Sequence, residues 1–388
     1  MVKKLVLCMA IVTLLACSAF SGHVKAQVAV DKWEIPFIDV LSGAISHIGL
    51  EIQWAVQKAV AEINDAGGIA GKPMVLKTFD SGYDPTRAVS CMKEAVKGSL
   101  VIIGPMSTME VRACSAIAAR QGVMCLPVAS SISEVGKVYP WAVVFIPSMD
   151  YMYRSTLDWY KLKPDIKSIV IFRDTKNPVW REAGSLVKKF SEQVGVKVLD
   201  TIDVDAGSVD VSAPAVRGLG KKPDGYFLCT EPAQTARIIL ELQDRGWKVN
   251  DSISCHNAIA CPTFLEVGAG RLDGVYFIGM PYNYDLPNPR WQAFLKAFGA
   301  AHGGGKPAMY VPPYFDAPYA IKEAIEKTGV TGDPAKLTEE RVKIRDYIRS
   351  MKGFEGVYKA YDMSEEGWAL LPGALAQVQK NKVAFIGK

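Results

Sequence analysis

Two adjacent hydroxyl side chains, Ser107 and Thr108, stand where the side chains and the backbone together can bind an anion. The apolar run LVIIG predicts a buried strand over 100–104, and a helix is predicted from about Glu110. A Gly-Pro pair turns the chain between these two elements. Free N–H groups at the start of a helix favour a carboxylate, but a hydroxyl there also serves as an ordinary helix cap. The residues alone leave both interpretations open.

The same pattern follows the next apolar run. GVMCLPV over 122–128 predicts a strand, and Ala129, Ser130 and Ser131 come directly after it. Ligands of open α/β sheets bind beyond the carboxyl ends of the strands. These three residues therefore either contribute to a binding site or form an ordinary polar loop.

Alternating strands and helices must position these loops. Residues 49–66 place apolar side chains three and four positions apart, which predicts a helix, and Gly67-Gly68 ends it. Strands and helices alternate in this way from about 33 to 128 and again from about 168 to 280. The alternation predicts an α/β fold whose parallel sheets are covered by helices on both faces.

The length of the chain and the order of its elements predict two lobes. A chain of 388 residues is too long for one ordinary core, and the two alternating runs are separated near Pro147. A mostly helical segment over 290–350 and short strands from about Gly356 follow. We expect two Rossmann-like lobes with parallel sheets, joined by a hinge of three strands that can close on a ligand. The expected division is 27–146 plus 280–355 for lobe 1, and 147–279 plus 356–388 for lobe 2.

The first 26 residues resemble an export signal. Lys3 and Lys4 precede an apolar run from Leu5 to Phe20, which is too short to span a bilayer. Cleavage is expected after Ala26, and a cut before Cys17, which would then carry a lipid, is the alternative. This leader holds three lysines and no acid, so its removal lowers the formal charge from +5 to +2. Such a balance gives no support for nucleic-acid binding, and we expect a periplasmic protein.

Metal and enzyme signatures are weak. The six cysteines beyond the leader form no CxxC pair, so we expect no metal site. Most of them are expected to be small buried side chains, and Cys255 and Cys261, which flank a turn, are candidates for a disulfide. No GxSxG, P-loop or HExxH motif occurs. We expect no cofactor and no enzymatic activity. The six are Cys91, Cys114, Cys125, Cys229, Cys255 and Cys261.

Several segments resemble the type I periplasmic solute-binding proteins of ABC transporters, in particular the leucine/isoleucine/valine-binding proteins. The resemblance is strongest over 41–89 and covers nearly the whole chain beyond the leader. It rests on AEIN at 61–64, GGIAGK at 67–72, Asp80 with Asp84-Pro85, IIGPMST at 102–108 and GVMCLPVASS at 122–131.

The resemblance implies a monomeric receptor without enzymatic activity that closes around a small polar solute and presents it to a membrane permease. A ligand sensor of the same fold, feeding a regulatory partner, is the main alternative, and an exported hydrolase is a third. Amino acids, amides and aromatic acids remain open as solutes.

The resemblance also implies a set of cleft residues, with departures in the second lobe. Trp180 is either a stacking lid or a core aromatic. Glu231 stands where relatives carry an aromatic side chain, and Asn257 where amino-acid binders commonly carry an acid for the ligand ammonium. The implied ligand-binding residues are His47, Ile48, Ser107, Thr108, Ala129, Ser130, Ser131, Val179, Trp180, Thr230, Glu231 and Asn257.

Overall fold

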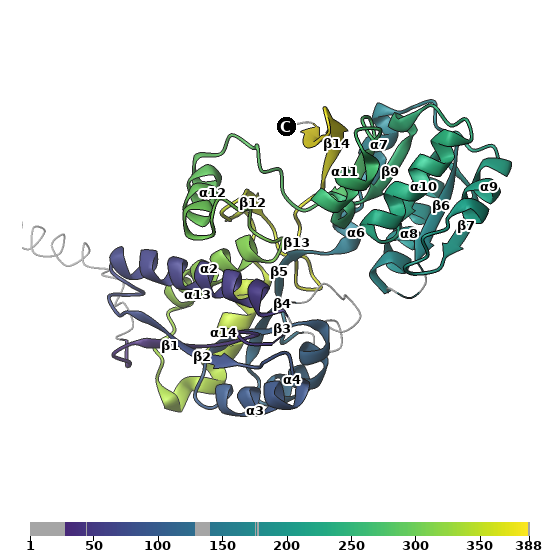
Figure 1. Ribbon diagram of the computed structural model, residues 1–388. Coiled ribbons are helices and arrows are strands. Elements are labelled where there is room, and N and C mark those ends of the chain that lie inside the picture. The colour runs from purple at the N-terminus through teal and green to yellow at the C-terminus, as the bar shows by residue number, and fades with distance from the viewer. Residues whose placement is uncertain (1–27, 44, 129–139, 175, 177, 387–388) are drawn as a thin grey trace, which may run out of the picture.

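The computed structural model describes residues 28–43, 45–128, 140–174, 176 and 178–386, and it shows two lobes joined by extended segments (Figure 1). The predicted leader, including Cys17, lies outside these residues. Within the described residues each lobe has its own hydrophobic core around its own sheet, and the core of the first lobe consists of two clusters on opposite faces of that sheet. The α/β class predicted from the alternating pattern is confirmed.

The first lobe contains a parallel sheet in the order β2-β1-β3-β4. A parallel bridge between Cys125 and Ala142 places β5 beside β4, and β13 pairs with β5. The short β11 and β12 form an antiparallel ribbon. The strands are β1 (Trp33–Asp39), β2 (Met74–Asp80), β3 (Val101–Met106), β4 (Met124–Val128), β5 (Val144–Pro147), β11 (Phe354–Glu355), β12 (Ala360–Tyr361) and β13 (Trp368–Ala369).

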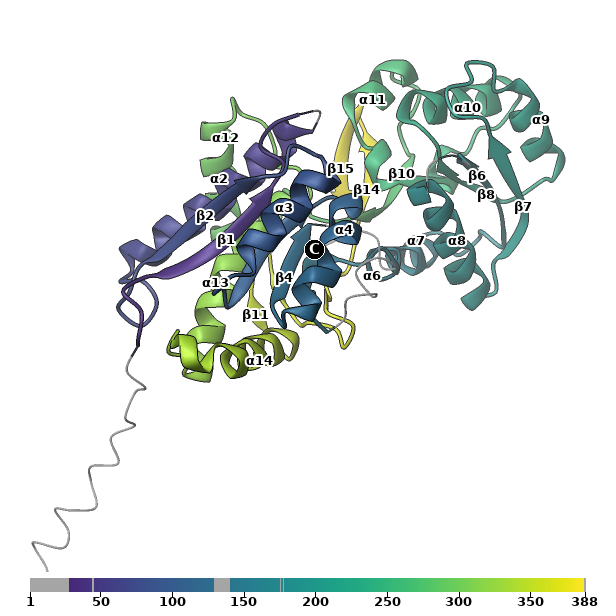
Figure 2. The same cartoon turned by 90° about the horizontal axis from the view of Figure 1, so that it is seen from below.

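Helices cover both faces of the first sheet because its strands are apolar on both sides. Phe37 belongs to the core that includes α2 and α13, whereas its neighbour Ile38 packs with α3 and α4 on the opposite face. Figure 2 shows α3 and α4 together on one side of the sheet. The helices are α2 (Ser46–Asp65), α3 (Pro85–Ala95), α4 (Thr108–Arg120), α12 (Pro289–Ala301), α13 (Val311–Thr328), α14 (Leu337–Arg349) and the short η3 (Pro334–Lys336).

The second lobe holds a sheet in the order β15-β14-β10-β9-β8-β6-β7. Strands β6 to β10 are parallel, whereas the C-terminal hairpin β14–β15 runs antiparallel to β10 and gives the sheet a mixed edge. The strands are β6 (Ser168–Asp174), β7 (Lys197–Val204), β8 (Gly225–Cys229), β9 (Ile253–His256), β10 (Tyr276–Met280), β14 (Ala374–Gln379) and β15 (Lys382–Ile386). The helices are α6 (Met149–Met152), α7 (Ser155–Leu162), α8 (Pro178–Gln193), α9 (Ser212–Gly220), α10 (Pro232–Asp244), η1 (Asn250–Ser252), η2 (Asn257–Ile259) and α11 (Pro262–Gly268).

The chain passes between the two cores three times, at 147–149, 280–282 and 371–374. The third passage lies later than the sequence division at 355/356. Apolar residues between Val357 and Leu371 pack in the first core, and β13 pairs with β5 of the first lobe. Expecting all of 356–388 in the second lobe was therefore wrong for 357–371.

The six cysteines among the described residues are free thiols, including Cys255 and Cys261, so the disulfide considered from the sequence is not formed. Cys255 lies within β9 and is fully buried, as expected for a small apolar side chain. Cys114, Cys125 and Cys229 are buried in the same way, and burial raises the pKa of each of these thiols. Such thiols are unreactive structural residues.

Asp316 ties α13 to the segment that follows β11. Its Oδ1 accepts a hydrogen bond from the Val357 amide at 2.8 Å, and its Oδ2 accepts one from the Tyr361 hydroxyl at 3.3 Å. Burial raises the pKa of this carboxyl to about 7, while these hydrogen bonds and Arg290 oppose the shift. The folded protein therefore holds the proton more tightly than the unfolded chain does.

Stability should consequently fall as the pH rises from about 4, the pKa of an unfolded aspartate, to about 7. Asp316→Asn keeps an acceptor for Val357 and removes the titration. We expect it to reduce this loss of unfolding free energy by at least about 1 kcal/mol. Urea denaturation at a series of pH values measures the effect, and an unchanged pH profile in the variant would contradict the assignment.

Candidate functional site

The carboxyl ends of β1, β3 and β4 meet at one edge of the first sheet, and Ser107 lies there as the N-cap of α4. Its Oγ accepts a hydrogen bond from the Glu110 amide at 3.3 Å and lies 3.2 Å from Glu110 Oε2. Its own amide donates to the Val128 carbonyl at 2.9 Å. The capping role considered for Ser107 is thus formed, and the same bonds hold the loop against the end of β4.

Strand β3 reaches this edge two residues later than the sequence suggested. The expected end at Gly104 was wrong, because the strand continues to Met106 with an irregular register between Ile103 and Met106. Gly104 has φ +99°, and a Cβ there would lie 2.0 Å from the Ile38 carbonyl oxygen. Only glycine permits this close approach of β3 to β1.

A cavity of about 180 Å³ opens beside Ser107, at the start of α2 and α4. The cavity brings together three of the predicted site residues, Ile48, Ser107 and Thr108, which are half-buried. Helix α2 has no acid in its first turn and no side-chain cap, so no side chain of that turn offsets the positive end of its dipole. The cavity is lined by Ile45, Ile48, Met106, Ser107, Thr108, Val128 and Tyr310.

Tyr310 is a lining residue that the sequence reasoning missed. It is the N-cap of α13, and it follows the loop that begins with Gly303 and Gly304. A triple glycine before Val311-Pro312-Pro313 marks a helix end and a helix start, which could have located this loop. Its neighbour Met309 packs against both hydrophobic cores, so the loop touches both lobes.

The remaining predicted residues of the first lobe are not among the described residues that line the cavity. His47 is exposed on the first turn of α2 and does not line the cavity, which agrees with the surface alternative. Ala129, Ser130 and Ser131 lie outside the described residues. They follow Val128, which does line the cavity.

Two buried acids lie behind the cavity wall. Asp39 ends β1, and Glu110 is in the first turn of α4. Burial raises the pKa of Asp39 well above its ordinary value, opposed by a bond from the Val40 amide and reinforced by Glu110 and Asp80. Burial also raises the pKa of Glu110, opposed by bonds with Ser81 and Ser107. Both shifts favour neutral carboxyls, which weakens repulsion of an anion at the cavity.

The second lobe presents an aromatic pair at the carboxyl edge of its sheet. Trp180, in the first turn of α8, meets His256, the last residue of β9, edge to face with ring centroids 4.6 Å apart. Burial lowers the pKa of His256 to about 3, and its Nδ1 accepts a hydrogen bond from the Ala258 amide at 2.9 Å. The imidazole is therefore neutral. Trp180 belongs to the core, which was the alternative to a stacking lid.

The other predicted residues of the second lobe differ in accessibility. Val179 and Glu231 are exposed at the starts of α8 and α10. Thr230 is fully buried, with its hydroxyl 2.8 Å from that of Thr235, so its side chain does not reach the surface. Asn257 is half-buried and donates a hydrogen bond of 2.5 Å to the Gly279 carbonyl.

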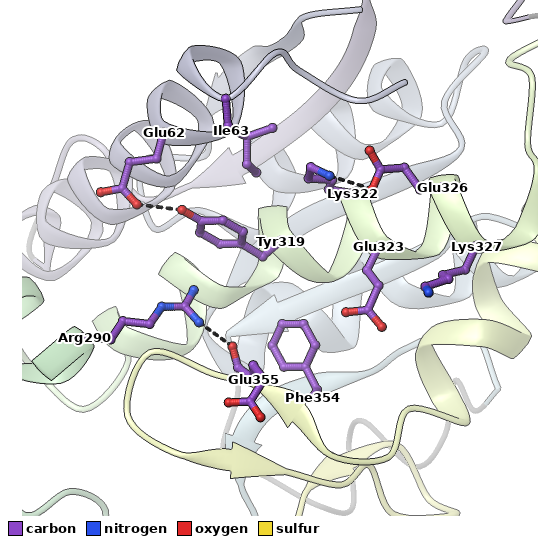
Figure 3. Close-up of a pocket in the computed structure, with 11 residues that line it drawn as sticks. Glu62, Ile63, Arg290, Tyr319, Lys322, Glu323, Glu326, Lys327, Phe354 and Glu355 are labelled. Atoms are coloured by element: carbon purple, nitrogen blue, oxygen red, sulfur yellow. Dashed lines mark hydrogen bonds and ion pairs between the residues drawn. The ribbon is translucent and has the colours of Figure 1, made fainter. Parts of the chain in front are cut away.

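A larger hollow, about 630 Å³, lies elsewhere, at the other end of α2 (Figure 3). Glu62 lines it and accepts a hydrogen bond from the Tyr319 hydroxyl at 2.6 Å, and Lys322 pairs with Glu326 at 2.5 Å. Arg290 donates to the Glu355 carbonyl at 2.6 Å. These polar groups are already paired, and the two residues of β11 contribute to the lining. The 20 residues of α2 span about 30 Å, which separates this hollow from the Ser107 cavity.

Within the described ranges, no group of three or more His, Cys, Asp or Glu side chains is arranged to hold a metal ion. A search of the same residues finds no helix with the length and apolar character of a membrane span. The cavity's own lining offers hydroxyls, backbone amides and apolar surface.

Two α/β lobes, three connecting segments and a cavity at the carboxyl edge of one sheet define the class of two-lobed binding proteins. The family profile described as "Periplasmic binding protein" matches residues 32–382, and the chain belongs to this family.

Among curated proteins, the chain is 22% identical over 362 residues to the leucine-, isoleucine-, valine-, threonine- and alanine-binding protein of Pseudomonas aeruginosa, covering 92% of this chain and 95% of that one. It is 26% identical to the Leu/Ile/Val-binding protein homolog 1 of Brucella suis, covering 93% of each.

Solved structures share the fold. An ABC transporter substrate-binding protein from Sphaerobacter thermophilus superposes with a TM-score of 0.74 at 17% identity, over 92% of this chain and 96% of that one. The branched-chain amino acid transporter substrate-binding protein of Streptococcus pneumoniae, solved with isoleucine, gives 0.66 at 20% identity, over 92% and 99%.

The position of the cavity depends on Gly104, which supports a direct test. Gly104→Ala should lower the unfolding free energy by at least about 3 kcal/mol or prevent folding, because its Cβ would overlap the Ile38 carbonyl. Gly98→Ala is the matched control, since Gly98 also has a positive φ but no atom lies within 4 Å of the position that its Cβ would take, so only about 1 kcal/mol should be lost. Equal stability of the two variants in chemical denaturation would refute this role of Gly104.

Proposed function

We propose that the protein is the extracytoplasmic solute-binding component of an ABC importer, which holds a small organic solute between its lobes. The observation that carries the proposal is the meeting of two helix N-termini, of α2 and α4, at the hydroxyl-bearing edge of the first sheet. Membership of the periplasmic binding protein family supports it.

In this proposal, the first lobe binds the acidic end of the solute. The start of α2 carries no acid in its first turn, and Thr108 adds a hydroxyl donor on the facing helix. The Ser107 hydroxyl donates to Glu110 in the structure and would exchange that bond for one to the solute. Oriented N–H groups at a helix start attract a carboxylate and need little rearrangement to do so. The raised pKa of buried Glu110 limits the opposing negative charge behind the site.

The second lobe then completes the site by rotating about the three connecting segments. Binding energy that exists only when both lobes touch the solute shifts the population toward the closed form. Met309, which already packs against both cores, lies directly beside Tyr310 of the cavity. The solute leaves chemically unchanged, because the proposed role is binding and delivery.

Several finer features belong to the same proposal. The protein is exported by residues 1–26 or anchored by a lipid on Cys17, acts as a monomer in the periplasm and delivers its solute to a membrane permease. The names of the relatives, which include binding of leucine, isoleucine and valine, support an amino acid or a related carboxylate or amide as the solute.

A thermal-shift screen and a double variant test the proposal. Leucine, isoleucine, valine, phenylalanine, benzoate and acetamide are the probes, and a bound solute should raise the melting temperature. For any probe that binds, Ser107→Ala with Thr108→Ala should weaken binding by more than about tenfold in calorimetric titration, or at least about 1.4 kcal/mol.

Ser90→Ala with Thr328→Ala is the matched control, because it removes the same two residue types from helices where each hydroxyl bonds only its own helix backbone. The control should leave affinity unchanged. Unaltered affinity in the Ser107/Thr108 variant would show that the solute binds elsewhere.

A further inference from the structure

We propose that the solute is a monocarboxylic acid with an apolar body and no ammonium group. This inference rests on the proposed function and concerns the same site. It follows from the uncharged side chains at the candidate site in both lobes. It also follows from the described acids near the first-lobe cavity, which are buried or already hydrogen-bonded and so are not free to bind an ammonium group.

The lining of the first-lobe cavity is apolar apart from its hydroxyls. Ile48 and Tyr310 face it from α2 and α13, together with Ile45, Met106 and Val128. None of these described lining residues carries a charge. An ammonium group enclosed here would lose its hydration without gaining an ionic partner, which is costly. A cavity of about 180 Å³ accommodates a ring or a branched alkyl group, since an engineered apolar cavity of about 150 Å³ binds benzene.

The described acids near this cavity are already hydrogen-bonded or enclosed. Glu51, half-buried on α2, accepts a hydrogen bond from the Ala308 amide at 3.2 Å. Glu110 and Asp39 have no exposed surface, so neither can touch a solute. Asp80 lies at the end of β2, where it accepts hydrogen bonds from the Ser42 hydroxyl at 2.7 Å and from Arg87 at 2.9 Å, as well as three from backbone amides. Its charge is balanced by groups of its own lobe.

The second lobe likewise places uncharged side chains at the carboxyl edge of its sheet. Trp180 and His256 form its edge-to-face pair, and the imidazole is neutral because burial lowers its pKa to about 3. Asp174, which ends β6, is buried and accepts a hydrogen bond from the Lys176 amide at 2.6 Å. Glu231 is the exposed acid of the predicted set, and its use by an ammonium group is the opposing outcome of the test below.

Matched pairs of ligands separate the two outcomes. The full exported protein is titrated by calorimetry with 3-phenylpropanoate against phenylalanine, and with 4-methylpentanoate against leucine. Each pair differs only by the α-ammonium group. We expect at least one acid to bind more than about tenfold tighter than its amino acid. Tighter binding of the amino acid in both pairs, or no binding of either acid, would overturn the inference.

A charge introduced into the cavity sharpens the test. Ile48→Asp should weaken binding of the acid by more than about tenfold and shift the preference of a pair toward the amino acid, which gains a partner for its ammonium group. Leu50→Asp is the control on the same helix, because Leu50 is 49% exposed and outside the lining. The pair comparison in the unmodified protein decides the inference even where Ile48→Asp does not fold.

Failure of this inference is distinguishable from failure of the proposed function. An amino acid that binds tightly and loses affinity in the Ser107→Ala, Thr108→Ala variant leaves the proposed site in place and overturns only the solute class. If a solute binds the variant and the unmodified protein with equal affinity, the proposed binding site is wrong.

Discussion

The contact between β3 and β1 at Gly104 determines where the candidate site lies. A strand that carries Ser107 and Thr108 at its end can reach the sheet edge only because no side chain separates Gly104 from the Ile38 carbonyl. The Ser107 amide then bonds the end of β4, and α4 begins at Thr108. The hydroxyls, the helix start and the apolar wall of the cavity are therefore placed by one backbone contact.

Much of the architecture follows from the period of the apolar residues. Runs such as GYFLC at 225–229 are buried on both faces, which is typical of parallel strands between helices, and the strand found there has these same bounds. The third passage between the lobes was predicted too early. Short strands such as β11 and β13 have two residues each, and their pairing depends on distant partners that no local pattern reveals.

The candidate site was also predictable only in part, because some of its contacts follow from the order of the elements and others join distant segments. Ile48, Ser107 and Thr108 meet at one cavity because parallel strands share an edge, and that rule needs only the order of the elements. Tyr310 arrives from a segment some two hundred residues away, so only the folded chain shows it. The contact between Trp180 of α8 and His256 at the end of β9 likewise joins elements that are not consecutive in the chain. Ser107 also bonds Glu110, and this bond competes with a bond from Ser107 to a ligand.

Each of the three passages between the lobes contains a proline: Pro147, Pro281 and Pro372. The pyrrolidine ring fixes φ near −65°, so each linker loses one of its backbone rotations. Any rotation of one lobe relative to the other therefore has fewer free backbone torsions than it would have with linkers that lack proline. In the proposed closure, this restriction reduces the conformational entropy lost when the lobes close, so the solute needs to supply less binding free energy.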